Sequence, residues 1–325
     1  MHYKTAWITW ERQPRNVSLA NLFSSDYYEF DDIKNTFVRY IIYIKRTISI
    51  FTKGYSTVFV QNPSIVLSFV GICLAKLTST QVVIDAHNAG VRPLEGRFFL
   101  LQVFNRWILR QASFVIVTNP HTQLFLKGFS ISSFVLPDPL PSMLIDSKVC
   151  RSNELKYDIF VVCSWSEDEP IKEYLNAATL LPDLSFAFTG KFNNFFAKNK
   201  DLNIPGNVTM LGFVSESDYI WMMKHANVIL DITTREDCLV CGAYEAISLD
   251  KPILLANSFV NKDLFGDAAF YSEVTVEELV SAIQYAYLKR GLIKENIAKF
   301  KIEYAKKELA AKNRLLKLLR TLKKQ

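Results

Sequence analysis

Short runs of β-branched and aromatic residues recur along the chain, and a longer stretch with the apolar spacing of a helix follows each of them. In the first half we interpret residues 5–10, 57–61, 81–86, 113–118 and 133–136 as strands. Strands that alternate with helices are typical of parallel sheets covered by helices. The first half therefore predicts an α/β domain.

A second series of the same kind follows an interruption. The sequence PDPLP at residues 137–141 breaks the pattern, and we interpret residues 137–153 as a linker. The expected elements beyond it are strands at 157–163, 185–189, 207–213, 227–232 and 252–256, with helices at 169–181, 216–226 and 242–249.

The length of 325 residues also fits two domains. We expect one Rossmann-like domain at 1–145 and a second at 146–290. A basic helix at 291–325 should follow, packed on the N-terminal domain or lying at a membrane. Open parallel sheets bind ligands beyond the carboxyl ends of their strands, so the site is expected in a cleft between the two sheets.

Charge and cysteine content limit the expected partners and the expected cellular compartment. The formal charge is +6, and residues 299–324 hold ten Lys or Arg against two Glu, which is +8. The rest of the chain is therefore near −2, and no aromatic-interleaved basic motif accompanies the tail, so we expect no nucleic-acid partner. Five cysteines and no hydrophobic leader predict a cytoplasmic protein. The longest apolar run, 65–75, is too short to span a membrane.

The stretch TTREDCLVCGAYEA, residues 233–246, concentrates candidate chemistry. It connects a strand to a helix, and the free N–H groups and dipole at a helix N-terminus favour an anion such as a diphosphate. The backbone amides of Cys238, Leu239 and Val240 are candidates to hold it. Asp237 and Glu245 are two carboxylates able to bind sugar hydroxyls, or else ordinary acids at a helix start.

The spacing D-x7-E in EDCLVCGAYEA resembles the E-x7-E signature of family-4-like glycosyltransferases. VFVQNPS, VVIDAHNAG and CSWSEDEP are similar to segments of the chitobiosyl-lipid β-1,4-mannosyltransferases. The resemblance implies a GT-B fold, in which two Rossmann-like domains face a cleft, and a long C-terminal helix. Asp237 stands where the family has its first Glu, and CLVC replaces a glycine-rich segment.

The resemblance also implies an activity. The activity is the transfer of a hexose from a UDP or GDP sugar to a glycan or lipid-linked acceptor, in bacterial polysaccharide or glycoconjugate assembly, without a metal or other cofactor. The resemblance implies that the domain at 1–145 binds the acceptor and the domain at 146–290 binds the nucleotide sugar. Asp237 would hold the sugar and Glu245 the ribose, and His87 would contact the sugar during catalysis. His87 is otherwise a residue that caps the following loop.

Further candidates follow other strands, each with an ordinary structural alternative. Ser164 is expected to bind the diphosphate or to belong to a helix start. Lys191 and Arg235 are cations for the phosphates or solvated surface charges, and Phe213 lines the base pocket or only packs.

Other features of the sequence are candidates for acceptor, membrane or metal binding. Arg12 and Arg15 either meet an anionic acceptor or face solvent. Residues 37–53 and 98–110 have apolar faces fringed by positive charge, which suit an anionic membrane surface or the interior of the first domain. Cys238 and Cys241 form a C-x-x-C without a second ligand pair, so a metal or redox site is not expected.

Two rival functions stay open. A nucleotide-sugar epimerase of the same architecture would need no acceptor. A non-catalytic sugar-nucleotide-binding subunit would fit the absence of the Gly-Arg and Lys residues that grip the diphosphate in many relatives.

Overall fold

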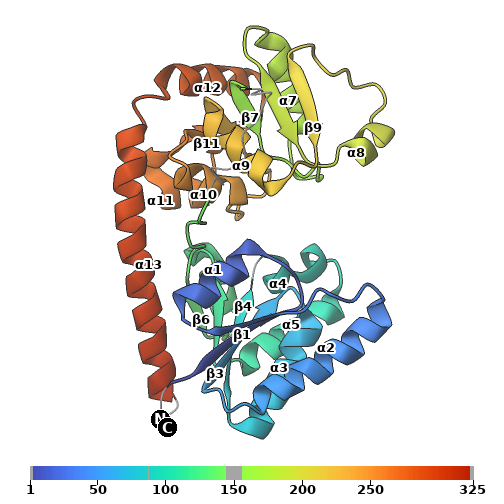
Figure 1. Cartoon of the computed structure of the whole chain (residues 1–325), viewed down its shortest axis with the longest axis vertical. Helices are drawn as coiled ribbons and strands as arrows, with labels where there is room; N and C mark the ends of the chain where they lie inside the picture. The colour runs from blue at the N-terminus through green and yellow to red at the C-terminus, as the bar shows by residue number, and fades with distance from the viewer. Residues whose placement is uncertain (1–2, 87, 144–155, 323–325) are drawn as a thin grey trace. The chain divides into compact units, whose positions relative to one another are not determined.

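The structure is a computed structural model that describes residues 3–86, 88–143 and 156–322. Packing divides the chain into two compact units. The first contains residues 1–139 and 306–325, and the second contains residues 140–305. Each unit is built on its own parallel sheet (Figure 1).

The first sheet has the strand order β2-β1-β3-β4-β5-β6, with every pair parallel. Its strands are β1 (Thr5–Thr9), β2 (Asp26–Glu29), β3 (Thr57–Asn62), β4 (Gln81–Ala86), β5 (Phe114–Val117) and β6 (Ser133–Val135). The helices of this unit are α1 (Pro14–Leu22), α2 (Thr36–Phe51), α3 (Ile65–Thr78), α4 (Asn88–Val91), α5 (Phe99–Gln111) and α6 (Pro120–Lys127). A 3₁₀ turn, η1 (Pro93–Gly96), precedes α5.

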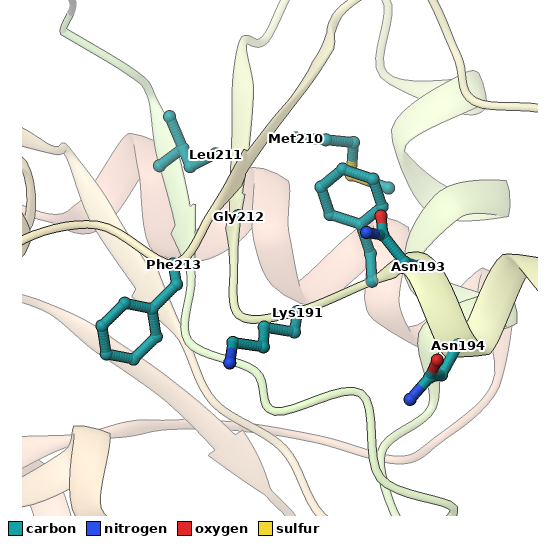
Figure 2. A pocket seen from close by; sticks show the side chains of 8 residues that line it. Lys191, Asn193, Asn194, Met210, Leu211, Gly212 and Phe213 are labelled. Atoms are coloured by element: carbon teal, nitrogen blue, oxygen red, sulfur yellow. The ribbon is translucent and has the colours of Figure 1, made fainter.

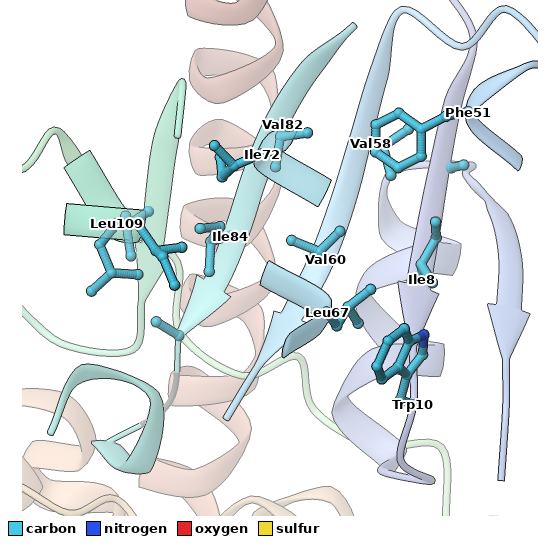
Figure 3. Packing of buried hydrophobic residues seen from close by; sticks show 14 of the residues in the cluster. Ile8, Trp10, Phe51, Val58, Val60, Leu67, Ile72, Val82, Ile84 and Leu109 are labelled. Atoms are coloured by element: carbon cyan, nitrogen blue, oxygen red, sulfur yellow. The ribbon is translucent and has the colours of Figure 1, made fainter. Parts of the chain in front are cut away.

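Alternate residues of each strand enter different cores. Ile8 and Val60 pack with α2, α3 and α5 on one face (Figure 3). Trp7 and Phe59 pack with α1 on the opposite face. Because the side chains of a strand alternate between faces, both faces of this sheet are apolar and covered.

The second sheet has the order β12-β11-β10-β7-β8-β9 and is also parallel. Its strands are β7 (Ile159–Val161), β8 (Phe186–Thr189), β9 (Val208–Gly212), β10 (Val228–Leu230), β11 (Ile253–Ala256) and β12 (Phe270–Ser272). Helices α7 (Ile171–Leu180) and α12 (Val276–Lys289) cover one face. Helices α9 (Glu216–His225), α10 (Cys241–Ser248) and α11 (Phe259–Phe265) contribute to the core of the other.

The second unit also contains α8 (Asn193–Lys198) and the 3₁₀ turn η2 (Gly266–Ala268). The last helix, α13 (Lys294–Leu322), contributes residues to both units. Its first turns bury Ile297 and Tyr304 in the second unit. Nearer its end, Leu315 and Leu319 are fully buried against Trp7 and its neighbours in the first unit.

The prediction of two Rossmann-like parallel sheets with a long C-terminal helix is confirmed. The sequence pattern did not predict β2 or β12. β2 is an edge strand whose residues are all partly or fully exposed, so its sequence DYYE has no buried apolar face to reveal it. β12 has only three residues, too few to show a period.

Candidate functional site

The strand order of the second sheet reverses between β7 and β10. From β7 the chain first adds β8 and β9 on one side, and then adds β10 on the other. At such a switch point the loops after the two strands diverge and leave room for a ligand at the carboxyl edge. The loop from β7 to α7 and the loop from β10 to α10 both start there.

A pocket of about 400 Å³ lies at the same edge, where β8 and β9 end. Two glycines with positive φ shape it: Gly190 (φ +83°) after β8 and Gly212 (φ +69°) at the end of β9. The Gly190 amide donates to the Gly212 carbonyl at 2.9 Å. A Cβ on Gly190 would lie 2.2 Å from the Cys163 carbonyl oxygen, so only glycine allows this approach.

These two turns present Lys191 and Phe213 to the pocket. Figure 2 shows both side chains, together with the amide side chains of Asn193 and Asn194 from α8. The Lys191 ammonium lies 5.8 Å from the centre of the Phe213 ring, which is 83% exposed. A cation beside an open aromatic face suits a ligand with both a flat ring and an anionic group.

The loop after β7 wraps around one carboxylate, that of Glu169. The amide of Ser164 donates to it at 2.9 Å and that of Trp165 at 2.7 Å, and the Ser164 hydroxyl donates at 2.8 Å. Trp165 has φ +66°, which helps successive N–H groups to converge on one anion, as in a nest. The Ser164 donors that were expected to meet a diphosphate therefore bind an internal carboxylate in this structure.

A second carboxylate, Asp231, lies directly beyond β10 and beside the start of α10. The Gly242 amide donates to its Oδ2 at 2.9 Å, and a Cβ on Gly242 would come within 2.4 Å of that oxygen. Burial raises the pKa of Asp231 well above its ordinary value, and nearby Glu245 adds to the shift, although the Gly242 hydrogen bond opposes it. The close approach that Gly242 permits is thus made to Asp231.

Glu245 lies on the second turn of α10 and accepts a 2.5 Å hydrogen bond from the Tyr219 hydroxyl of α9. Burial raises the pKa of Glu245, and the hydrogen bond from Tyr219 opposes the shift. Burial also raises the pKa of Tyr219 well above its usual value, with the Glu245 charge as the next cause. The carboxylate is therefore oriented by a neighbouring helix.

The loop before α10 is tied to the loop after β7 through Asp168. Asp168 accepts from the Thr233 hydroxyl at 2.7 Å and pairs with the Arg235 guanidinium at 3.3 Å. The Cys238 amide donates to the Arg235 carbonyl at 3.4 Å. Asp237, Cys238, Leu239 and Val240 are all partly exposed in this loop, and α10 starts at Cys241.

In the first unit, Arg15 and Arg12 have different environments. Arg15 is 8% exposed and forms a two-bond ion pair with Asp85, its Nη2 lying 2.8 Å from Oδ1, and it also pairs with Asp138. The solvent-facing alternative is therefore wrong for Arg15. Arg12 is exposed. His87 lies outside the described residues.

The pocket brings together Lys191 and Phe213, which were selected separately from the sequence. The sequence pattern did not indicate Asp231, Glu169, Tyr219, Asn193 or Asn194 as site residues. For Asp231 a signal existed, because an acid directly after the apolar run VIL is placed at a strand's carboxyl end. Within residues 3–86, 88–143 and 156–322, no group of three or more His, Cys, Asp or Glu residues is arranged to hold a metal ion.

Comparison with known sequences finds neither a matching family model nor a matching curated protein. Comparison with solved structures finds many similar chains. Anabaena HepE, in a complex with UDP-glucose, matches with a TM-score of 0.73 at 12% identity over 100% of both chains.

Sucrose-phosphate synthase from Thermosynechococcus elongatus matches with a TM-score of 0.72 at 15% identity over 99% of both chains. A putative UDP-N-acetylglucosamine 2-epimerase from Listeria monocytogenes matches at 0.63 and 12% identity, over 96% of this chain and 94% of that one. At such identities the likeness shows the fold and not the activity. The chain therefore has a GT-B glycosyltransferase fold.

Proposed function

We propose that the chain is a glycosyltransferase that moves a hexose from a nucleoside diphosphate sugar to a glycan or lipid-linked acceptor. The observation that carries the proposal is the pocket at the ends of β8 and β9, in which Lys191 lies beside the exposed ring of Phe213. A nucleotide has the flat ring and the anionic group that this pair suits. HepE, which shares the fold, was crystallised with UDP-glucose.

In this proposal the base stacks on Phe213, and Lys191 contacts the diphosphate. Glu245, held by Tyr219, binds the ribose. Asp237 and the amides of Cys238, Leu239 and Val240 meet the sugar and phosphates at the start of α10. His87 assists at the sugar, and Arg12 belongs to the acceptor side. Arg15 is buried with Asp85 and Asp138, so it would support the acceptor side without contacting the acceptor.

The carboxylate of Glu169 limits where a diphosphate can bind. Glu169 takes the amides after β7, so a diphosphate must bind beside that loop or displace Glu169 from it. Lys191 is then the cation that stabilises negative charge on the departing diphosphate, which is the main catalytic contribution a transferase without a metal requires.

The test measures binding of UDP, GDP and uridine to the purified chain by calorimetry. We expect Phe213→Ala to weaken binding of the preferred nucleotide about tenfold, because stacking on an aromatic ring contributes about 1–3 kcal/mol. Lys191→Gln should weaken the diphosphate far more than the nucleoside. Phe259→Ala is the matched control, since Phe259 is 75% exposed in the same unit but does not line the pocket.

Binding that is unaffected by both pocket variants would remove the donor-site assignment. Turnover then separates the remaining functions. A transferase releases UDP or GDP and glycosylates an added acceptor, whereas an epimerase, which the Listeria neighbour makes the second candidate, yields a rearranged sugar nucleotide without an acceptor. Binding without either product would identify a non-catalytic subunit.

A further inference from the structure

The outer side of helix α5 carries large apolar side chains that remain exposed to solvent. Six of them lie at its start and along one side, with exposures of 41–81%: Phe98, Phe99, Leu100, Val103, Phe104 and Trp107. We call these six residues the α5 face. Such a concentration of exposed aromatic and aliphatic side chains marks an interaction site, because most soluble surfaces scatter their apolar residues singly.

The burial pattern of α5 is the reverse of an ordinary amphipathic helix over its first half. Gln102 and Asn105 point inward, where Gln102 donates to the Pro93 carbonyl at 2.7 Å and Asn105 to the Gly90 carbonyl at 2.8 Å. The neighbouring Phe104 remains outside, 43% exposed. Burial in the core of the first unit therefore does not explain why the α5 face is made of apolar residues.

The apolar surface continues onto α3, and α2 also exposes apolar side chains. Phe69 of α3 lies 5.7 Å from Phe104 and 6.4 Å from Trp107, measured between ring centres. Helix α3 packs against both α2 and α5, and Figure 1 shows the three on the same side of the first sheet. Ile41 and Ile48 of α2 are each 43% exposed.

The charge on these three helices has one sign. Helices α2, α3 and α5 contain no Asp or Glu, and they contain the cations Arg39, Lys45, Arg46, Lys76, Arg106 and Arg110. Of these, Arg46 is paired with Asp32, which precedes α2 in the chain. In the second unit α7, α9 and α12 all carry acids in their first turns, where the helix dipole favours them. Lys45 and Lys76 are exposed. Lys45 shares a side of α2 with Ile41 and Ile48 at helical spacing, so this cation borders the exposed apolar residues of α2.

We propose that the α5 face docks on an anionic lipid bilayer, with its apolar side chains at the level of the headgroups and the bordering Lys and Arg on the lipid phosphates. Aromatic side chains favour the membrane–water interface. An apolar surface bordered by cations binds anionic lipid both through burial of apolar area and through electrostatic attraction to the headgroups. Among the described residues no helix is long and apolar enough to cross a membrane, so this contact is a peripheral one. The proposal does not depend on the donor site.

The experiment is sedimentation of the purified full chain with phosphatidylcholine vesicles, with and without about 30 mol% phosphatidylglycerol. We expect binding to the anionic vesicles, weaker binding to the neutral ones, and a loss of the difference at high salt. Phe99→Ser/Leu100→Ser should lower the partition at least about tenfold, because it removes the two most exposed side chains of the face. Lys45→Gln/Lys76→Gln should lower the preference for anionic lipid by about fivefold for each lysine.

The matched control is Leu288→Ser/Leu292→Ser, since these leucines are 75% and 72% exposed in the second unit. Circular dichroism establishes that each variant is folded. The proposal is overturned if the wild-type chain does not sediment with anionic vesicles, or if the Phe99→Ser/Leu100→Ser variant binds like the control. It is also overturned if light scattering finds a wild-type dimer that this variant dissociates while vesicle binding is absent, since the face would then cover a second copy of the chain.

Discussion

At the carboxyl edge of the second sheet, single carboxyl groups hold the loops in place by accepting hydrogen bonds from backbone amides. Glu169 gathers the amides after β7, and Asp231 holds the Gly242 amide at the start of α10. In the first unit, the buried carboxylate of Asp85 instead meets the guanidinium of Arg15. Buried charges need such partners, because an unpaired one costs several kcal/mol. The carboxyl groups near the strand ends therefore accept hydrogen bonds from backbone amides in the second unit and from an arginine side chain in the first.

Asp231 gives a pH-dependent prediction. Its pKa is raised in the folded state, so the folded protein holds the proton more tightly than the unfolded chain does. The free energy of unfolding should therefore fall as pH rises above the ordinary Asp value of about 3.9, up to the folded pKa. Asp231→Asn keeps an acceptor for the Gly242 amide but has no carboxyl group to ionise, so its free energy of unfolding should not show this fall with rising pH. In urea unfolding, the variant should gain stability relative to wild type between acidic and neutral pH.

Asp168→Asn is the comparison variant, because the pKa of Asp168 is lowered in the folded protein whereas that of Asp231 is raised. Burial alone would raise the pKa of Asp168, but hydrogen bonds from Ser166 and Thr233 and the charge of Arg235 lower it overall. This variant should lose stability at neutral pH and approach wild type as the pH falls through the ordinary Asp range. A pH-independent effect of Asp231→Asn would show that its carboxyl group is not held with a raised pKa.

At the scale of elements, strands with strong apolar runs were predicted to within a few residues. The β4 interval of 81–86 matches the structure, because its residues are almost all buried and its flanks are polar or turn-forming. Helix α8 was not predicted, since its six residues NNFFAK offer fewer than two turns of pattern. The C-terminal basic helix was predicted, but its charge obscured the buried leucines near its end.

Those leucines provide an element-scale prediction. Leu315→Ala or Leu319→Ala should lower the free energy of unfolding by about 2–5 kcal/mol, because each leaves a cavity in the core that contains Trp7. Leu309→Ala, at a position 53% exposed on the same helix, should change it by less than about 0.5 kcal/mol. Chemical denaturation followed by tryptophan fluorescence measures both. Equal effects at buried and exposed positions would contradict this packing of α13.

At the scale of the whole molecule, each unit has apolar cores on both sides of its own sheet. Each is therefore stabilised mainly by its own packing, and α13 supplies residues to both. The candidate donor pocket lies wholly within the second unit, and the α5 face wholly within the first. Nucleotide binding and lipid binding should consequently be separable by mutation.

Hydrogen exchange measures this separation. A nucleotide at 100 times its dissociation constant should stabilise the unit that binds it by about 2.7 kcal/mol, seen as slower exchange in the amides around β8 and β9. The central strands β1, β3 and β4 of the first unit should be unchanged. Protection that appears first in those strands would place the nucleotide in the first unit and contradict the proposed donor site.

The sequence predicted the architecture, because alternating strand and helix periods and the break at PDPLP depend only on local pattern. It also selected Lys191 and Phe213, since both follow strands and strand ends share one edge of a parallel sheet. The partners of each group depend instead on the folded structure: Glu169 with the Ser164 loop, Asp231 with Gly242, Arg15 with Asp85, and the aromatic side chains of α5 with solvent. Arg15 and Asp85 are 70 residues apart, and sheet order and helix packing set their contact. Glu169 and Ser164 are only 5 residues apart, but they meet in a loop in which Trp165 has a positive φ, and no hydrophobic period encodes that backbone conformation.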